Sequence, residues 1–557
     1  MAINKSVLNH YVIIFIITLL SHGLLLINDG LYWDGWLSKG YLDNGDWESV
    51  KQQTFEMGLP VIGYLMWALK VLKIHEYYKL TAFLMIFLSA TLIYKIADRL
   101  KYTTKFESLL IAVIFVTFPA YQTSIEISTL QYLIFLFLFY LSIFLIVEVK
   151  YGDIQRYKYL INFLALVGLF ISFNMNSLLV YFYAFILILA IKEININKNL
   201  LSEIKKFLIK NLIFILLPFI YFGCRKYLTP PHGLYEGYHS FNLDPIFIIS
   251  LVIQYIRVSV LGQIFNSLVN LKGCLILLFI GFFCIEIYYR IAVFKFKKGF
   301  YSNINVDSWF NTANIRPLAF FSAVCIFTAI LPYAVVGLFP AIRGVNTRHS
   351  ILISLPVALL IISIFRNYSI NFNQLDKASR IIFKKTQLII IWILVLSFIY
   401  SCNLYYISWQ ARAIKDNAVL SILKSKGDIK SHSIYWIDDQ YKIGPTAEYS
   451  YYEYSSMFKK IWGGESRLGL PLTYYDSNRS ILQKGQISMI HRYNLGEFDA
   501  RGSSLFMTIK PKQNYSEAEL VFLYYINRSK SFYKKIDMNN FYDNLLSIEY
   551  SLLPPKK

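Results

Sequence analysis

The chain has 557 residues, of which 56% are hydrophobic, and its formal net charge is +21. Soluble globular proteins contain about 45–50% apolar residues, so this composition and the mean hydropathy of +0.46 exclude an ordinary soluble protein. Lys and Arg lie mainly in short connections between apolar runs, with no basic domain, so we read the charge as a membrane topology signal and expect no nucleic acid partner. The five cysteines include no CxxC pair, which argues against a disulfide framework or a cysteine metal site.

Apolar runs of the length needed to cross a bilayer recur along the first 407 residues. A window of about 20 apolar residues predicts about eleven spans, with the N-terminus in the cytoplasm and the C-terminus outside. The predicted spans are residues 9–28, 79–97, 106–121, 129–148, 159–174, 176–192, 211–227, 273–293, 317–339, 350–366 and 387–407.

The basic connections favour this layout because they all fall on one side of it. They are residues 98–105, 150–158, 192–210, 294–300 and 376–385, which we place in the cytoplasm. Two further apolar runs, at 58–74 and 245–265, would invert every later basic loop if each were a full crossing. Both carry a cation, Lys70 and Arg257 respectively, so we expect helices that lie in or dip into the outer interface.

From residue 408 the composition changes and no apolar run is long enough to span. We therefore predict two parts: a transmembrane domain at 1–407, with an external acidic loop at 29–78, and an extracytoplasmic C-terminal domain at 408–557. The segments "SIYWI", "ISMIHRY" and "SSLFMTIK" have the composition of strands. The fold class is thus an α-helical polytopic membrane protein with a mixed α/β C-terminal domain.

The stretch "INDGLYWDGWLSKGYLDNGDWESV", residues 27–50, follows the first span directly and mixes acids with tryptophans. For Asp43, Asp46 and Glu48 we favour solvation, or a helix cap at Asp46, because "GDWES" is typical of a helix start. Asp29 and Asp34 lie nearest the membrane and remain as candidates for chemistry.

The layout sorts the other polar residues by side, and the outer side collects both acids and cations. Glu126 lies in "FPAYQTSIEIS", while the cations come from "CRKYLTPPHG" and "PAIRGVNTRHS". The outer cations and histidines are Arg225, Lys226, His232, Arg343, Arg348 and His349. Two arginines in one external loop break the inside bias and suggest phosphate binding.

This inventory suits transfer of a sugar from a polyprenyl phosphate, whose headgroup lies at the membrane surface. The phosphate leaves as a stable anion, so the reaction needs a carboxylate to accept the proton of the attacking hydroxyl and cations to hold the departing phosphate. A divalent metal is compatible with this reaction but not required by it.

The layout of the chain resembles that of the membrane glycosyltransferases of the C type (GT-C fold). The shared features are a first span followed by an acidic loop, here "NDGLYWDGW", interfacial helices in the same loop, many further spans and an external C-terminal domain. The resemblance implies that an Asp of the first external loop is the catalytic base. It also implies a second external acid near the end of the third span, where Glu126 stands. No two acids are adjacent here, so the match is to the looser pattern of that family.

We expect Asp34 to be the base, with Asp29 and Glu126 orienting the acceptor or a metal. Arg348, together with Arg343 or Arg225, would hold the phosphate, and Lys226 and His349 complete the donor site. The donor would be a polyprenyl-phosphate sugar and the acceptor a glycan, a lipid or a protein. The site would face outward from the plasma membrane.

Two alternatives stay open. One is a lipid-linked polysaccharide polymerase or ligase of another type, in which the external arginines do the main work and Asp34 is dispensable. The other is a transporter of lipid-linked saccharides, which would place ionisable groups at mid-bilayer depth. Glu286 in "CIEIYYR" is the candidate for that role, although we favour an intrahelical pair with Arg290, four residues on, as its explanation.

Overall fold

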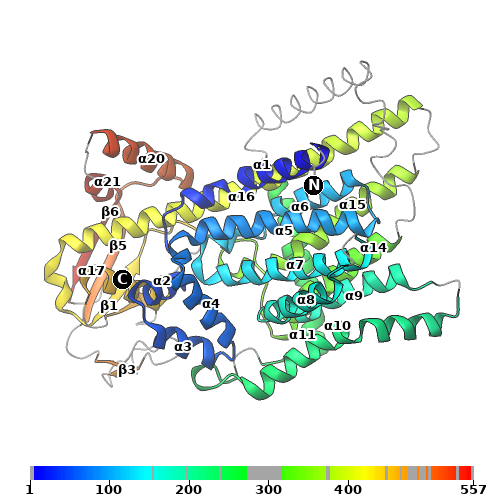
Figure 1. Cartoon of the computed structure of the whole chain (residues 1–557). Coiled ribbons are helices and arrows are strands. Elements are labelled where there is room, and N and C mark those ends of the chain that lie inside the picture. The colour runs from blue at the N-terminus through cyan, green and yellow to red at the C-terminus, as the bar shows by residue number, and fades with distance from the viewer. Residues whose placement is uncertain are drawn as a thin grey trace.

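The computed structural model describes residues 5–152, 156–195, 198–237, 240–271, 316–371, 377–445, 449–463, 467–473, 486–488, 497–499, 504–534 and 538–552. A helical bundle occupies one end of the molecule and a small mixed sheet the other (Figure 1). The helices of the first half are α1 (Lys5–Ile27), α2 (Gly35–Asn44), α3 (Trp47–Glu56), α4 (Pro60–Val71), η1 (Ile74–Tyr77), α5 (Tyr78–Leu100), α6 (Lys105–Thr117), η2 (Gln122–Ile125), η3 (Ile127–Thr129), α7 (Leu130–Tyr151), α8 (Lys158–Ser172), α9 (Ser177–Glu193) and α10 (Leu200–Leu228). The helices that follow, up to the sheet, are η4 (Gly233–Tyr235), α11 (Pro245–Tyr255), η5 (Ile256–Gly262), α12 (Gln263–Leu271), α14 (Arg316–Val335), η8 (Val345–Ile353), α15 (Ser354–Asn371), α16 (Lys377–Ser425) and η9 (Gly427–Ser431).

Eight helical segments of the described chain are long and apolar enough to cross a membrane, which supports a membrane-embedded helical protein. They are Asn9–Ile27, Ile74–Leu100, Ile127–Tyr151, Leu200–Leu228, Pro245–Leu271, Pro317–Val335, Val345–Asn367 and Thr386–Ser425. Seven of them coincide with predicted spans. Three other predicted spans form the shorter helices α6, α8 and α9, and the one predicted at 273–293 lies outside the described residues.

The helical segment Pro245–Leu271 differs from its prediction. It is one continuous apolar helix, π-helical in the middle, and by length and composition it could cross a membrane, so leaving 245–265 out of the spans is not confirmed. At its start the Asn242 amide donates to the Val335 carbonyl, and near its end Asn270 Nδ2 donates to Ser401 Oγ.

The connections that the sequence assigns to opposite sides of the membrane lie at opposite ends of the bundle. At one end Arg99 pairs with Glu148 at 2.9 Å, Lys150 pairs with Glu193 at 2.5 Å and Lys192 donates to the Leu100 carbonyl, so three predicted cytoplasmic connections meet there. At the other end lie the loop after α1, the α8–α9 turn and the ends of α10 and α14. Which end faces the cytoplasm remains a prediction.

The acidic loop contains the helices α2, α3 and α4, and the helix start at Asp46 and a helix within 58–74 agree with the sequence, while their position in the membrane interface stays a prediction. The helix α3 begins at Asp46, whose side chain accepts from the Ser49 amide at 3.1 Å, which confirms the predicted cap. The helix α4 begins with Pro60 at its first position, where the absent N–H costs nothing. Trp47 packs against Trp67 with ring centroids 5.1 Å apart, so the two helices form a hairpin.

The helix α16 joins the two parts of the molecule without a break. It runs beside α1 in the bundle and continues into the C-terminal domain (Figure 1). The predicted boundary at 407/408 therefore lies inside a helix. Buried apolar residues, among them Ala411, Ile414 and Ala418, keep α16 helical beyond the bundle because they pack in the core of the C-terminal domain.

The C-terminal domain is a mixed α/β unit, as predicted. Its remaining elements are β1 (Ile434–Asp439), α17 (Tyr451–Trp462), β2 (Leu468–Pro471), β3 (Gln486–Ser488), β4 (Glu497–Asp499), β5 (Ser504–Pro511), α20 (Glu517–Lys534), α21 (Met538–Leu545) and β6 (Leu546–Ser551). The main sheet has the order β2-β1-β5-β6, with β1 parallel to β2 and β5 and with β6 antiparallel to β5. The segments "SIYWI" and "SSLFMTIK" form β1 and β5, and only the first residues of "ISMIHRY" are described, in β3.

A buried ion pair holds α15 to α6 at the end of the bundle with the basic connections. Arg366 contacts Glu107 through two hydrogen bonds of 3.0 and 2.7 Å, and both side chains are at most 1% exposed. We expect Arg366→Met to lower the free energy of unfolding by about 3–5 kcal/mol, because it leaves a carboxylate buried without its counterion.

The matched control is Lys206→Met, which breaks the exposed pair of Lys206 with Glu203 and should cost less than about 1 kcal/mol. Thermal unfolding of both variants in detergent measures the difference. Equal losses of stability would contradict this account of the pair.

Candidate functional site

A cavity of about 260 Å³ lies where the acidic-loop helices meet the ends of the bundle helices. This volume approaches the lower end of the range of about 300–1,000 Å³ that small-molecule sites occupy. Its walls come from the turn before α2, from α3 and α4, from the start of α7, from the α8–α9 turn, from the ends of α10 and α14, and from η8. Its polar and aromatic lining comprises Trp33, Asp34, Ser38, Gln53, Thr54, Ser128, Gln131, Tyr132, Asn174, Asn176, Ser177, Arg225, Tyr235, Tyr333, Arg348 and His349.

Four of the eight predicted site residues line this cavity, although they are up to 315 positions apart in the chain. They are Asp34, Arg225, Arg348 and His349. The cavity thus brings one predicted acid together with cations from two later connections. Glu126 lies directly behind the wall, and the other three predicted residues are elsewhere.

Asp34 stands at the start of α2, after a turn of unusual conformation. Trp33 has a φ of +46°, a left-handed value that bulky residues seldom adopt, and its amide donates to Glu453 Oε1 at 2.9 Å. Burial, and after it the charge of the nearby Asp34 carboxylate, raises the pKa of Tyr452 well above its usual value. The C-terminal domain therefore contacts both residues of this turn.

Arg348 is fixed beside Asp34 by an aromatic ring and a histidine. Its guanidinium lies 4.1 Å from the centroid of the Trp33 ring, a cation–π geometry, and its Nε donates to His349 Nε2 at 3.3 Å. The His349 Nδ1 lies 3.4 Å from the Phe339 carbonyl. Since Nε2 accepts, we assign His349 as the neutral tautomer that carries its proton on Nδ1.

Both cavity arginines keep a buried donor that the described residues do not satisfy. Arg348 Nη1 and Arg225 Nε have no hydrogen-bond partner in the part of the chain that the structure describes. A buried unsatisfied guanidinium nitrogen is costly, and an anionic ligand with several acceptor oxygens would satisfy it. The arrangement is suited to a phosphate group.

Glu126 is buried against α2 at the back of the cavity. It is 2% exposed, it accepts from Ser128, and a Cβ at Gly35 would collide with its Oε1. Burial is the main cause that raises the pKa of Glu126 to about 8, with the Asp34 charge acting in the same direction and Ser128 and Arg348 acting against it. The raised pKa favours the protonated form of Glu126 at neutral pH, and the charged side chains of the cavity lining are Asp34, Arg225 and Arg348.

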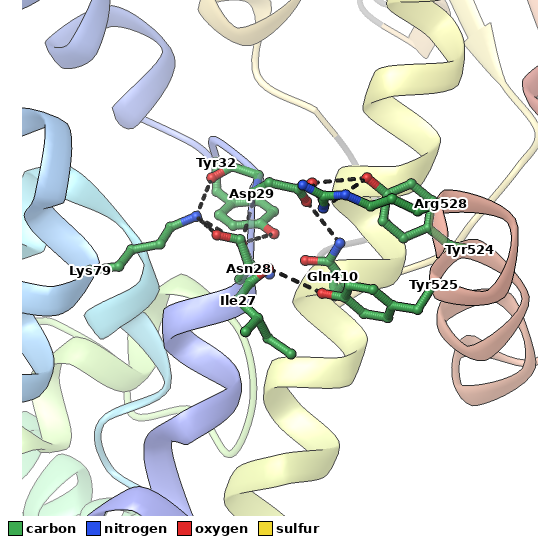
Figure 2. A network of polar contacts seen from close by, with 10 residues as sticks. Ile27, Asn28, Asp29, Tyr32, Lys79, Gln410, Tyr524, Tyr525 and Arg528 are labelled. Carbon is green, nitrogen blue, oxygen red and sulfur yellow. Dashed lines mark hydrogen bonds and ion pairs between the residues drawn. The ribbon is translucent and has the colours of Figure 1, made fainter. Parts of the chain in front are cut away.

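Asp29 lies outside the cavity, in a network that joins the acidic loop to the C-terminal domain (Figure 2). Its carboxylate accepts from Gln410 and Tyr524, both at 2.9 Å, and from Arg528 at 2.7 Å. The preceding residue, Asn28, is held by Lys79, whose Nζ donates to the Asn28 carbonyl at 2.6 Å. These contacts give Asp29 the role of an anchor for the loop.

Arg343 and Lys226 also lie away from the cavity lining. The Arg343 guanidinium lies 5.6 Å from the centroid of the Tyr405 ring on α16. Lys226 is exposed, next to Tyr227, whereas the preceding residue, Arg225, faces the cavity. Of the two cations at the end of α10, only Arg225 lines the cavity, and of the two arginines in the loop before α15, only Arg348 does.

Sequence reasoning missed Tyr452 and Glu453 as neighbours of the site. They begin α17, and no local signal in "SYYEYSS" points to the Trp33–Asp34 turn, more than 400 residues earlier in the chain. Asn174 and Asn176 fall inside the predicted spans 159–174 and 176–192 but line the cavity, because α8 ends at Ser172 and α9 begins at Ser177.

No group of three or more His, Cys, Asp or Glu side chains able to hold a metal occurs among the described residues. Glu286 and Arg290, the residues of the transporter alternative, lie outside the described ranges.

Gly35 tests the packing of α2 on Glu126. We expect Gly35→Ala to force α2 away from the Glu126 carboxyl, since the added methyl group has no space there, and to lower the midpoint of thermal unfolding.

Gly40 is the control for Gly35, because it lies in the same helix and an added Cβ meets nothing within 4 Å. Gly40→Ala should leave the unfolding midpoint unchanged or raise it, because alanine has a higher helix propensity than glycine, a difference of up to about 1 kcal/mol in stability. A Gly35→Ala protein as stable as the Gly40→Ala protein would contradict the close packing.

The raised pKa of Glu126 gives a signed prediction for pH. The carboxyl has a pKa of about 8 in the folded protein and 4.5 in the unfolded chain. Between these two values the folded protein keeps the proton and the unfolded chain releases it, so stability falls as pH rises from about 4.5 to 8. Glu126→Gln should flatten this part of the stability profile, measured as the unfolding midpoint at several pH values. An unchanged profile in the variant would assign the pH dependence to other groups.

No protein-family model, curated protein or solved structure matches this chain. The function is therefore inferred from the residues of the chain itself.

Proposed function

We propose that the protein is a membrane glycosyltransferase that moves a sugar from a polyprenyl-phosphate donor to a hydroxyl-bearing acceptor at the outer face of the membrane. The observation that carries the proposal is a single cavity at one end of the bundle, lined by Asp34 and by two arginines that each keep a buried, unsatisfied donor. A carboxylate and phosphate-binding cations are the groups that this reaction requires.

The reaction is a displacement at the anomeric carbon. The acceptor oxygen attacks this carbon and forms the new C–O bond while the bond to the phosphate oxygen breaks. The proton of the acceptor hydroxyl passes to Asp34, and the polyprenyl phosphate leaves as an anion held by Arg348 and Arg225. One displacement inverts the anomeric centre.

The remaining cavity residues fit supporting roles in this reaction. Trp33, Tyr132, Tyr235 and Tyr333 offer aromatic faces to a sugar ring. Glu126, protonated at neutral pH, adds no negative charge that would repel the phosphate. His349 orients Arg348 by accepting from its Nε.

The site lies at the end of the bundle helices, where a lipid-linked headgroup meets the protein. The resemblance of the acidic loop and of the overall layout to the C-type membrane glycosyltransferases supports the same reaction class. In this proposal the N-terminus is cytoplasmic, and the cavity and the C-terminal domain face outward from the plasma membrane. The acceptor is a glycan, a lipid or a protein, and a divalent metal is not required.

The first test is the profile of surface glycans and lipid-linked saccharides, measured by mass spectrometry, in cells carrying wild-type protein, no protein, or a variant at matched abundance. Asp34→Asn should remove the same sugar mass as the deletion, since loss of a general base costs about 10²–10⁴-fold in rate. Arg348→Gln should slow transfer by about 10–100-fold, since a hydrogen bond to a charged group contributes about 1.5–3 kcal/mol.

The matched controls are Arg343→Gln and Lys226→Gln, which remove cations from the same connections but from outside the cavity. Both should leave the profile normal. A normal profile for Asp34→Asn, with Arg348→Gln defective, would favour the arginine-based polymerase or ligase. Loss of function in Glu286→Gln with a normal Asp34→Asn would favour the transporter.

A further inference from the structure

The helix α17 of the C-terminal domain begins against the turn that carries Asp34. Ser450 and Glu453 form a capping box at its start, in which Glu453 Oε2 accepts from the Ser450 amide at 2.8 Å. The same carboxylate accepts from the Trp33 amide through Oε1 and forms an ion pair with Arg412 of α16. A capping box needs only the first of these contacts, so Glu453 does more than begin a helix.

The contact with Trp33 stabilises an uncommon backbone conformation. Trp33 has a φ of +46°, and its amide donates to Glu453 Oε1 at 2.9 Å. The same turn sets the indole ring against the Arg348 guanidinium and places Asp34 in the cavity wall. One buried carboxylate therefore contacts the residue whose ring lies on Arg348 and whose neighbour is Asp34.

We propose that Glu453 is a positioning residue and that the cavity attains its working geometry only when α17 is docked on the Trp33–Asp34 turn. Glu453 is 1% exposed and lies outside the cavity lining, so it acts on the site through Trp33 and not on a substrate. Its effect on catalysis rests on the proposed function, whereas its effect on the turn does not.

A second contact of the C-terminal domain supports this inference independently. Four residues before Trp33, Asp29 is held by Tyr524 and Arg528 of α20 and by Gln410 of α16 (Figure 2). The domain thus contacts the acidic loop on both sides of residues 30–32, at Asp29 and at Trp33. A loop held at two points by one domain takes its conformation from the docking of that domain.

The experiment is hydrogen–deuterium exchange of the full-length protein in detergent, read on peptides covering residues 29–38, together with the steady-state transfer rate. Glu453→Gln keeps the size of the side chain but removes the charge that holds Arg412 and receives two amides. We expect exchange at residues 33–38 to rise at least tenfold, and kcat to fall at least tenfold with KM for the donor within threefold of wild type.

Two matched variants separate positioning from a structural role. Ser450→Ala breaks the capping box but leaves the contact between Glu453 and Trp33, so it should change neither exchange at 33–38 nor kcat by more than threefold. Lys459→Gln, at an exposed position of the same helix, should match wild type in both.

Unchanged exchange at 33–38 in Glu453→Gln would overturn the proposal, as would an equal rise in Ser450→Ala. If Asp34→Asn retains transfer while Glu453→Gln still loosens the turn, the proposed function fails and the positioning of the turn stands. If Asp34→Asn abolishes transfer while Glu453→Gln keeps both exchange and kcat, the positioning role fails and the proposed function stands.

Discussion

A polypeptide in a bilayer must satisfy its backbone hydrogen bonds internally, and this constraint confines irregular structure to the ends of the spanning helices. Side chains able to do chemistry in water then gather where those ends meet. In this protein the loop after α1, the start of α7, the α8–α9 turn and the ends of α10 and α14 converge at one end of the bundle. Residues as distant in the chain as Asp34 and Arg348 become neighbours because the spans repeatedly return the chain to the same end.

The charge of the cavity depends on the burial of Glu126. Were Glu126 ionised, it and Asp34 would balance Arg225 and Arg348, and the group would have no preference for an anion. Burial outweighs the opposing effects of Ser128 and Arg348 and keeps the carboxyl protonated at neutral pH. One net positive charge is then left in a partly dry site. Gly35 is part of this arrangement, because only a residue without a side chain lets α2 approach the Glu126 carboxyl so closely.

Composition and periodicity predicted those features that depend on local chemistry. The apolar runs, the Asp46 cap and the strands β1 and β5 were recognisable because each is encoded within about ten to twenty residues. Three of the predicted basic connections, 98–105, 150–158 and 192–210, meet at one end of the bundle, as their grouping on one side predicts. The change of composition at residue 408, by contrast, does not mark an element boundary, because α16 continues as one helix that is buried on most sides in the C-terminal domain.

The assignment of individual site residues needed the tertiary structure. Asp29 and Asp34 both stand near aromatic residues in one short loop, and what separates them is α20, nearly 500 residues away. Arg343 and Arg348 likewise share a loop, yet one lies on Tyr405 and the other on Trp33. No local pattern contains either distinction.

One turn of α16 attaches the acidic loop to the C-terminal domain. The Trp409 carbonyl accepts from Tyr32, the next residue contacts Asp29, and Arg412 reaches Trp33 through Glu453. These contacts differ in strength. The pair of Asp29 with Arg528 is partly exposed and contributes about 0–1 kcal/mol, whereas breaking the buried pair of Arg412 with Glu453 costs about 3–5 kcal/mol. Of the two ion pairs, the buried one at Glu453 therefore contributes more to stability, and Asp29 is held mainly by its combined hydrogen bonds to Gln410, Tyr524 and Arg528.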